Sequence, residues 1–180
     1  ETGYQWLLGL WEQDPLDPKW EVPEDEVCQV VEDAFARWRV WRFYCDPPYW
    51  ETVVAAWAGL HGKETVVFFL TNRYRQMADA VRGFTNALVD GGLSHDGSPD
   101  YARHIGNAHR RPLNQRDEEG RPLWVIQKER PDSPLKIDAA AAGVLSWRAR
   151  TDALTNGARA SGPSIWDQRA AAGEEVLPCV

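Results

Sequence analysis

Cysteine is scarce in this chain of 180 residues, and its few cysteines form no redox or metal-binding motif. Cys28, Cys45 and Cys179 are odd in number and lack CxxC spacing, so we expect free thiols in a reducing compartment. The four histidines add no zinc-site spacing, and no set of residues indicates a Ser-His-Asp or Cys-His nucleophile. A disulfide scaffold, a zinc module and a covalent mechanism of this kind are therefore not predicted.

Long apolar runs and an excess of positive charge are also missing. No run is long enough to span a bilayer and no signal-peptide pattern is present, so we expect no membrane partner. The chain begins at Glu1 without an initiating Met, which indicates a fragment or a processed chain. The formal net charge is −7. This charge argues against a protein that coats nucleic acid by charge alone, but it permits a nuclease whose metal ions offset an acidic site.

The chain does contain enough apolar sequence for one domain with a substantial core. Ten tryptophans are many for this length, and we expect most of them to help build that core. After the last expected helix, small residues, Gly162-Pro163 and weak apolar periodicity predict a flexible tail, with Ile165 and Trp166 as its anchors. We therefore divide the chain into a domain of residues 1–156 and a tail of residues 157–180.

Strand-like and helix-like patterns alternate along the domain, which favours an α/β fold with a central mixed sheet covered by helices. Glycines 91 and 92 are placed to end one of the helices, and a turn near Glu119-Gly120 is placed to close a hairpin. Strands are expected at 4–11, 40–45 and 65–70, a hairpin at 111–128, and helices at 24–38, 49–60, 74–88, 99–108 and 134–154.

Asp46 lies in the run Tyr44-Cys45-Asp46-Pro47-Pro48-Tyr49-Trp50, where an apolar strand ends and a loop begins. In α/β sheets, binding sites gather at the carboxyl ends of strands. An aspartate before proline is also an ordinary turn residue, and for an isolated Asp-Pro pair the turn is the commoner role. Its position alone therefore leaves a site residue and a turn residue as two interpretations.

Asp138 lies in Lys136-Ile137-Asp138, near the start of the last expected helix. With Ser133 as the N-cap and Pro134 as the first helical residue, Asp138 falls in the second turn, too far along to cap the helix. Its neighbours on the helix form an apolar stripe: Ala142, Leu145 and Ala149. A carboxylate on that side is costly unless a metal ion or a donor satisfies it, and a salt bridge to Lys136 or to an arginine is an equally good interpretation.

Two aspartates from distant points of a chain suit a two-metal site that cleaves phosphodiesters. Mg²⁺ and Mn²⁺ prefer oxygen ligands, and two ions about 3.5–4 Å apart can stabilise the attacking and leaving oxygens of a displacement at phosphorus. We therefore select Asp46 and Asp138 as candidate catalytic and metal-binding residues. We expect their carboxylates to converge in the fold and a metal-activated water to be the nucleophile.

One basic stretch stands out in this acidic chain: Arg103, His104, His109, Arg110, Arg111 and Arg116. It either contacts DNA phosphates or forms a solvated face, as charge runs usually do. From it we select Arg103, Arg110 and Arg111 as candidate DNA-binding residues, together with Lys136 beside Asp138. His95 and Asp96 could also approach the acidic pair, although Asp96 followed by Gly97 is more simply a turn.

Several short motifs follow one another in a fixed order: Leu93-Ser94-His95-Asp96-Gly97-Ser98-Pro99, Arg103-His104-Ile105-Gly106-Asn107-Ala108, Lys128, and Lys136-Ile137-Asp138-Ala139-Ala140. Their order and spacing resemble the C-terminal nuclease half of phage terminase large subunits, with its HDG-x-P segment, its Asn-Ala pair and its closing K-I-D-x-x-x-A helix. The run from Tyr44 to Trp50 resembles that family's aspartate-proline strand end. Thr71-Asn72-Arg73 with Met77-Ala78 resembles the version in actinobacterial phages. The resemblance covers roughly residues 3–158.

The resemblance implies a ribonuclease H-like fold, a mixed sheet flanked by helices, and metal-dependent endonuclease activity. Such a hydrolase cuts concatemeric double-stranded viral DNA during packaging, with two Mg²⁺ or Mn²⁺ ions held by three acidic residues. The family's second and third acidic residues correspond to Asp46 and Asp138. The implied partners are double-stranded DNA, the terminase ATPase domain, the small terminase subunit and the portal, and the implied location is the cytoplasm of the bacterial host.

Two parts of the family's pattern are not found here. The first acidic residue normally lies on a strand before the one that matches residues 4–11, so we expect an N-terminally truncated sheet. There is no GxxxxGK[ST] phosphate loop, so the ATPase half is absent. We expect the isolated chain to be inactive or nearly so and to be rescued by the upstream segment, unless Asp96 or Glu12 supplies the third carboxylate. Two alternatives stay open: a non-catalytic module that docks on DNA or the portal, and another ribonuclease H-like nuclease such as a resolvase.

Overall fold

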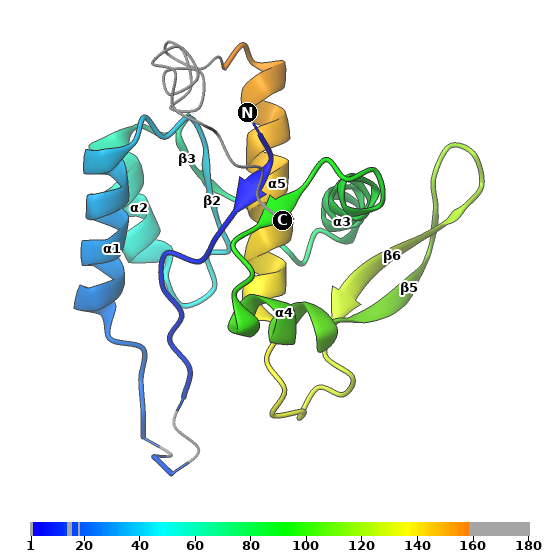
Figure 1. The fold of residues 1–180 in the computed structure, drawn as a ribbon, viewed down its shortest axis with the longest axis horizontal. Helices are drawn as coiled ribbons and strands as arrows, with labels where there is room; N and C mark the ends of the chain where they lie inside the picture. The colour runs from blue at the N-terminus through cyan, green and yellow to red at the C-terminus, as the bar shows by residue number, and fades with distance from the viewer. Residues whose placement is uncertain (1, 14–15, 18, 159–180) are drawn as a thin grey trace, which may run out of the picture.

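The computed structural model describes residues 2–13, 16–17 and 19–158 and shows an α/β fold (Figure 1). The helices are α1 (Glu24–Arg37), α2 (Glu51–His61), α3 (Tyr74–Val89), α4 (Pro99–Gly106) and α5 (Asp138–Thr155). The strands are β1 (Tyr4–Gln5), β2 (Phe43–Cys45), β3 (Val66–Phe68), β4 (Ser94–His95), β5 (His109–Arg116) and β6 (Pro122–Gln127). No helix of this described part is both long and apolar enough to cross a membrane.

The expected single mixed sheet is not formed by these residues. They form three separate pairs: β1 with β4, parallel; β2 with β3, parallel; and β5 with β6, antiparallel. The strand expected at 4–11 was too long, because only Tyr4 and Gln5 find partners, at Ser94 and His95 of β4. A strand needs a neighbour to satisfy its backbone groups, and the residues after Gln5 have none in this part of the chain.

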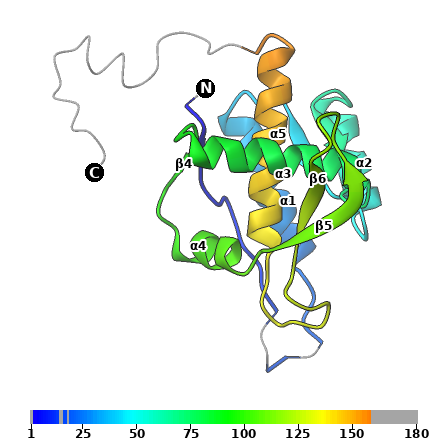
Figure 2. The same ribbon diagram turned by 90° about the vertical axis from the view of Figure 1, so that its right-hand side faces the viewer.

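Helix α5 is the centre of the molecule, and α3 with the β5–β6 hairpin covers one of its sides (Figure 2). The stripe predicted for α3 is confirmed: Met77, Ala78, Ala80, Val81, Phe84 and Ala87 are buried. Gly91, with φ of 68°, and Gly92 end the helix as expected, and the Gly92 N–H donates to the Ala87 carbonyl at 2.8 Å. The hairpin extends beyond α3 (Figure 1) and contributes Leu123 and Val125 to the core, so this side of α5 is well packed.

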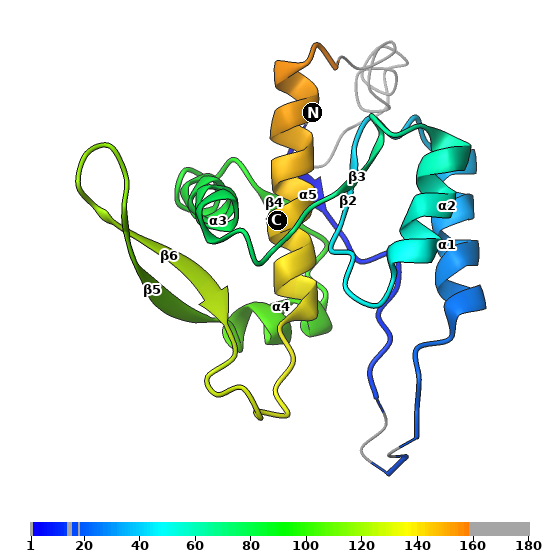
Figure 3. The ribbon, with the colours of Figure 1, turned by 180° about the vertical axis from the view of Figure 1, so that it is seen from behind.

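The other side of α5 faces β2, α1 and α2, as the view from behind shows (Figure 3). A second core cluster lies here, built on Cys45, Val54, Trp57, Ala58 and Val66. Helix α1 packs against this cluster, yet none of its residues is fully buried. The two halves of the molecule are therefore packed to different degrees.

The tryptophans lie nearer the surface than predicted, whereas the described cysteines agree with the prediction. Of the nine tryptophans in the described residues, Trp57 is buried, whereas Trp6 and Trp38 are exposed and the others are half-buried. The expectation that most of them build the core was wrong, because a large ring with a polar N–H is often placed at the edge of a core. Cys28 and Cys45 are free thiols, as predicted, whereas Cys179 lies outside the described residues.

Helix α5 begins at Asp138, four residues later than the prediction placed its start. Ser133 does not cap it, because the Ser133 Oγ instead accepts a hydrogen bond from the Leu135 N–H at 3.3 Å within the preceding loop. At the other end, α5 is followed by Asn156 and then by Gly157 and Ala158, the first two residues of the predicted tail. The rest of the predicted tail, residues 159–180 with Ile165 and Trp166, lies outside the described residues.

Candidate functional site

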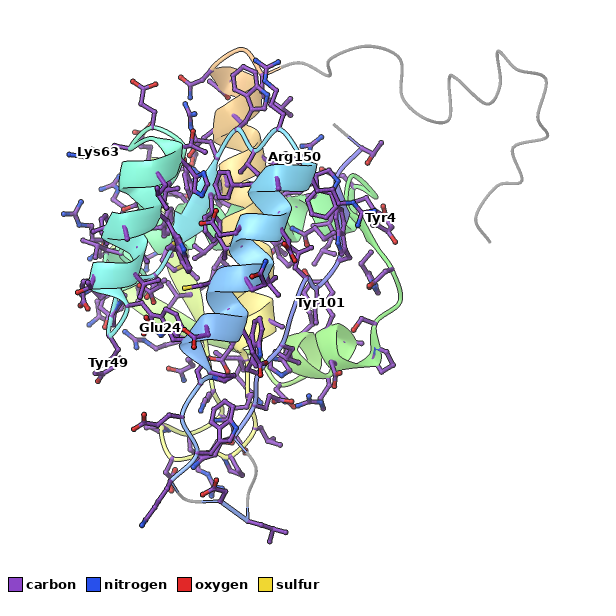
Figure 4. All side chains as sticks on the ribbon, turned by 90° about the vertical axis from the view of Figure 1, so that its left-hand side faces the viewer. Tyr4, Glu24, Tyr49, Lys63, Tyr101 and Arg150 are labelled. Carbon is purple, nitrogen blue, oxygen red and sulfur yellow. The ribbon has the colours of Figure 1, made fainter. Side chains whose placement is uncertain are left out.

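A groove of about 1070 Å³ runs between β1 and β2, with α5 along one side and α1 along the other. Neither β3 nor β4 lines it, so it lies at the outward edges of the two parallel pairs. Figure 4 views the molecule from the α1 side and labels two of the lining residues, Tyr101 and Arg150. Both candidate aspartates, Asp46 and Asp138, line this groove.

Asp46 follows directly after β2, and its exposed carboxylate joins two loops. Its Oδ2 accepts a hydrogen bond from the Thr71 hydroxyl at 2.7 Å, and its Oδ1 lies 3.4 Å from the Thr71 backbone N–H. Thr71 follows β3, so the two residues hold the carboxyl ends of β2 and β3 together. Asp46 is thus not merely a local turn residue, and the end of β2 presents its carboxylate to the groove.

Asp138 is the first residue of α5, and its side chain is exposed. The expectation that it sits in the second turn on a buried face was wrong, because the helix starts four residues later than predicted. No residue in the described ranges forms an ion pair or a hydrogen bond with its carboxylate, so the salt-bridge interpretation finds no support there. A carboxylate in the first turn of a helix is favoured by the free N–H groups and the helix dipole.

His104 of α4 fixes the start of α5. It is fully buried, and its Nδ1 accepts a hydrogen bond from the Ala139 N–H at 3.0 Å. Because Nδ1 is the acceptor, the ring proton lies on Nε2, which donates to Glu12 Oε1 at 3.1 Å. The side chain therefore replaces a helix cap and holds the backbone next to Asp138 in place. Sequence reasoning counted His104 only as part of a basic stretch, and it is not on a solvated face.

Both carboxylate oxygens of Glu12 already accept hydrogen bonds from α4, so Glu12 is not free to act as a third metal ligand. Its two oxygens accept hydrogen bonds from Arg103 at 2.5 and 3.1 Å, and Arg103 also pairs with Asp100 at 2.8 Å. The hydrogen bonds from Arg103 hold the pKa of Glu12 below its usual range, although partial burial opposes the shift. Arg103 was selected as a DNA-binding residue, but phosphate would have to compete with these two carboxylates for its guanidinium.

Asp96 and His95 likewise make local contacts. The Asp96 carboxylate accepts a hydrogen bond from the Ser98 N–H at 3.0 Å, which confirms the turn interpretation. His95 Nδ1 accepts from the Gly97 N–H at 3.0 Å in the same turn. Neither side chain lines the groove, so they do not join the pair of aspartates in this arrangement.

A buried polar contact ties β1 to α5 within the groove. The Tyr101 hydroxyl donates to Gln5 Oε1 at 2.7 Å, and Gln5 Nε2 donates to the Gly143 carbonyl at 2.9 Å. Burial raises the pKa of Tyr101 to about 12, so its hydroxyl stays protonated at neutral pH. A β-carbon on Gly143 would lie 2.2 Å from that hydroxyl, so this close approach requires glycine. Sequence reasoning missed this contact, because Gln5 and Tyr101 lie 96 residues apart.

The remaining basic candidates lie on other elements. Arg110 and Arg111 of β5 stack on aromatic rings, Arg110 over Trp124 at 4.4 Å and Arg111 over Tyr74 at 4.6 Å. Neither lines the groove, and the hairpin that carries them lies on the far side of α5 from α1 (Figure 1). Lys136 is two residues from Asp138, and its carbonyl accepts a hydrogen bond from the Asn107 side chain at 3.0 Å. Lys136 does not line the groove either, so none of the four basic candidates lies with the two aspartates at its wall.

Asp46 and Asp138 are the two carboxylates among the described residues that line the groove. Mg²⁺ and Mn²⁺ suit carboxylate oxygens, and both side chains are exposed to the same groove. Within the described ranges, however, no group of three Asp, Glu, His or Cys side chains is placed to hold a metal ion. Asp46 and Asp138 suit such ions in ligand type and accessibility, and no third carboxylate among the described residues lines the groove with them.

Comparison with known proteins relates the chain to two bacteriophage proteins. It is 30% identical over 169 residues to the Gene 13 protein of Mycobacterium phage L5, covering 89% of this chain and 27% of that protein. It is also 30% identical over 161 residues to the Gene 13 protein of Mycobacterium phage D29, covering 84% of this chain and 26% of that protein. The chain thus spans about a quarter of the length of these relatives. No protein-family model matches it, and no solved structure matches it.

Proposed function

We propose that this chain is the nuclease domain of a phage terminase large subunit, a metal-dependent endonuclease that cuts concatemeric double-stranded DNA. One observation carries the proposal: Asp46 and Asp138, 92 positions apart in the sequence, line one groove with accessible carboxylates. These are the two residues that the motif resemblance selects. The bacteriophage relatives agree with a protein that acts in an infected bacterial cell.

The chemistry assigned to the site needs two divalent ions, which stabilise the attacking and leaving oxygens of the phosphodiester when bound. The chain's own contribution is to present ligand oxygens at fixed positions. Thr71 orients the Asp46 carboxylate through its hydroxyl, and His104 fixes the backbone beside Asp138. Groups held in this way need little reorganisation when a cation arrives, which favours binding.

The proposal also accounts for the missing third ligand. A ribonuclease H-like site takes its first acidic residue from a further strand, and the described residues contain no third carboxylate at the groove. With two ligands, both ions bind weakly and the attacking water is poorly placed. We therefore expect little or no cleavage by this chain alone and full cleavage by a form that carries the upstream segment.

Plasmid cleavage with Mn²⁺ or Mg²⁺ tests the proposal, run on this chain and on the form extended upstream. In the extended form, Asp46→Asn and Asp138→Asn should each reduce cleavage by more than the roughly 100-fold that loss of a group hydrogen-bonded to a metal ligand costs. Asp90→Asn, at an exposed position just after α3, is the matched control and should cut normally. Normal cutting by both groove variants would contradict the assignment.

A non-catalytic docking module is the second candidate, and it is favoured because only two carboxylates of the described residues line the groove. A calorimetric titration of Mn²⁺ into the extended form distinguishes the nuclease from the docking module. Binding of two ions that is lost in Asp138→Asn supports the nuclease. DNA or portal binding without any Mn²⁺ binding would support the docking module instead.

DNA contact by the basic residues is a separate part of the proposal. Replacing Arg103, Arg110 and Arg111 together by Ala should weaken DNA binding for all sequences and flatten its salt dependence, because each phosphate contact releases counterions. The single variants then show which of the three matters. The salt-bridged Arg103 should contribute less than Arg110 or Arg111. If the salt dependence of DNA binding is unchanged in the triple variant, this basic stretch is a solvated face and not a DNA contact.

A further inference from the structure

Tyr49 combines an unfavourable backbone conformation with a fully exposed side chain. Its φ is 70°, and among the described residues it is the only one besides glycines with a positive φ. It is the third residue of a turn that the Trp50 N–H closes by donating to the Pro47 carbonyl at 2.7 Å. Such a type II turn favours glycine or asparagine at this position, because a bulky side chain costs free energy there. The ring is 98% exposed and makes no hydrogen bond or ring contact with the described residues, so nothing in this part of the chain offsets that cost.

The residues on both sides of Tyr49 are held in place. Before the turn, the Asp46 carboxylate is bound to the loop after β3, and Pro47 is buried. At the end of the turn, the Trp50 ring stacks on Trp57 of the second core cluster, with ring centroids 6.5 Å apart. Figure 4 shows Tyr49 near the start of α2, pointing away from the protein. The turn therefore holds one aromatic ring at a fixed position in the solvent.

Two exposed arginines follow the residue that binds Asp46. Thr71, whose hydroxyl donates to Asp46 at 2.7 Å, lies two residues before Arg73 and four before Arg75. Neither guanidinium pairs with a carboxylate of the described residues. In a chain with a net charge of −7, unpaired arginines beside a candidate metal ligand indicate a surface to which anions are attracted.

A third arginine reaches the same surface from the β5–β6 hairpin. The guanidinium of Arg111 lies over the ring of Tyr74, 4.6 Å from its centroid. Tyr74 is the first residue of α3 and directly follows Arg73, so the two arginines lie near each other although they are distant in sequence. Contacts thus connect Asp46 through the loop after β3 to Arg111. We call Tyr49, Arg73, Arg75 and Arg111 the Tyr49 surface.

An exposed aromatic ring beside several guanidinium groups matches the chemistry of single-stranded nucleic acid. Arginine binds phosphate with charge-assisted hydrogen bonds, and an unpaired base stacks on an exposed aromatic ring whatever its sequence. A base inside a duplex offers no free face to such a ring, because its neighbours cover both faces. Asp46, three residues before Tyr49, is the candidate ligand of ions that act on a phosphodiester. Nucleic acid is therefore the partner that this surface favours over a protein.

We propose that Tyr49 stacks on an unpaired base of the DNA strand that reaches Asp46, while Arg73, Arg75 and Arg111 bind phosphates of that strand. The chain therefore acts on DNA whose strands are locally separated near the cut. The inference rests on the proposed nuclease function for the identity of the partner. Contact with DNA then explains why an unfavourable backbone conformation is retained at Tyr49, as it is at other functional sites.

Binding of a fluorescein-labelled oligothymidylate of about ten nucleotides, measured by anisotropy in EDTA so that nothing is cut, gives the first test. Tyr49→Ala should weaken binding at least about fivefold, the lower end of what loss of one stacked base costs. Tyr49→Phe keeps the ring and should bind within about twofold of the native chain. Leu60→Ala, at an exposed position near the other end of α2, is the matched control and should bind normally.

The same oligothymidylate paired with oligoadenylate separates base stacking from backbone contact. Tyr49→Ala should change the affinity for this duplex less than about twofold, because the paired bases present no free face. An equal loss on single strand and duplex would overturn the proposal. So would a native chain that binds no oligothymidylate, or binds it equally well without the Tyr49 ring, and the ring would then belong to a contact with protein.

Photocrosslinking and salt dependence test the individual contacts. An oligothymidylate with 5-iododeoxyuridine in place of thymidine should crosslink to Tyr49 on irradiation, and mass spectrometry of the peptides identifies the position. Arg73→Gln, Arg75→Gln and Arg111→Gln together should reduce the slope of log affinity against log salt by about 2, since each phosphate on a single strand contributes about 0.7. Lys63→Gln, at the other exposed end of α2 (Figure 4), should leave it unchanged. Crosslinks only at other residues, or an unchanged slope in the triple variant, would contradict the proposed contacts.

Tyr49→Gly separates a role in binding from a role in folding. Glycine adopts positive φ readily, so this variant should keep the Tm of the native chain or raise it by up to about 4 °C, while it loses oligothymidylate binding as Tyr49→Ala does. A fall in Tm of more than about 4 °C would show that the ring stabilises the fold and would overturn the proposal.

The two proposals fail in different ways. Oligothymidylate binding that depends on Tyr49, with no metal-dependent cleavage by the form extended upstream, would refute the nuclease and support the Tyr49 contact. Cleavage that is lost in Asp46→Asn but is normal in Tyr49→Ala, on a plasmid and on a substrate with unpaired bases at the cut, would support the nuclease and refute the Tyr49 contact.

Discussion

Helix α5 has two sides, and they differ in how completely they are packed. On one side α3 buries six of its residues against α5 and the hairpin. On the other side α1, of similar length and with its own apolar stripe, buries none. The first side resembles the core of a finished domain, whereas the second leaves a groove of about 1070 Å³ with Asp46 and Asp138 on its wall. The more tightly packed core and the candidate site therefore lie on opposite sides of α5.

Matched valine deletions on the two sides should differ clearly in their effect on stability. Val81 of α3 is 1% exposed, and Val81→Ala should lower the free energy of unfolding by about 2 kcal/mol through lost burial and a new cavity. Val30 of α1 is half-buried at the groove, and Val30→Ala should cost less than about 1 kcal/mol. Chemical denaturation of both variants measures this. Equal losses would mean that the groove side is as well packed as the α3 side.

Gly143 marks one point where the groove side is tightly packed. Gly143→Ala should destabilise the fold by about 1–3 kcal/mol, because the new methyl group collides with the Tyr101 hydroxyl. Gly83→Ala in α3 is the control, since its β-carbon would meet nothing closer than 3.9 Å. That change should be neutral or stabilise by up to about 1 kcal/mol, as alanine favours helix. A tolerated Gly143→Ala would show that the Gln5–Tyr101 contact is dispensable.

The hydrogen bonds between Glu12 and α4 should make the free energy of unfolding depend on pH in the acid range. Because the hydrogen bonds from Arg103 lower the pKa of Glu12 in the folded state, this pairing stabilises the protein above the usual value of 4.5 and is lost as pH falls through the lower folded value. His104 and Arg103 face Glu12 from α4, and Asp100 shares Arg103. The effect should stay below about 1 kcal/mol, because the pair is partly exposed. Unfolding curves of the native protein and Glu12→Gln should converge as pH falls; a constant difference would refute the linkage.

The smallest expected effect concerns the aspartates themselves. If the two carboxylates converge, a double-mutant cycle of Asp46→Asn and Asp138→Asn should reveal mutual repulsion of a few tenths of a kcal/mol in the absence of metal. Neutralising either residue should therefore change stability little, in contrast to Val81→Ala. Thermal unfolding at low salt measures the coupling. A coupling of zero at low salt would indicate that the carboxylates lie too far apart to share a pair of ions.

Local patterns in the sequence determined the type and order of most elements. The apolar stripe of α3 and its ending at Gly91 and Gly92 follow from spacing and from glycine's access to positive φ. Asp46 could be placed at a strand end, since the prolines after it stop the strand. The aspartate pair itself was selected with the help of the motif resemblance, and the structure then placed both residues at one groove.

Contacts between distant parts of the chain set where α5 begins, how far β1 extends and what holds the groove together. A buried histidine 35 positions earlier in the chain satisfies the Ala139 N–H, so Ser133 is not used as a cap. Strand β1 stops after Gln5 because pairing requires a partner, which residues 6–13 do not find within the described chain. Such contacts join residues that are distant in sequence and leave no periodic pattern. Local propensity therefore predicts the helices, whereas the geometry of the site depends on which distant backbone groups find a partner.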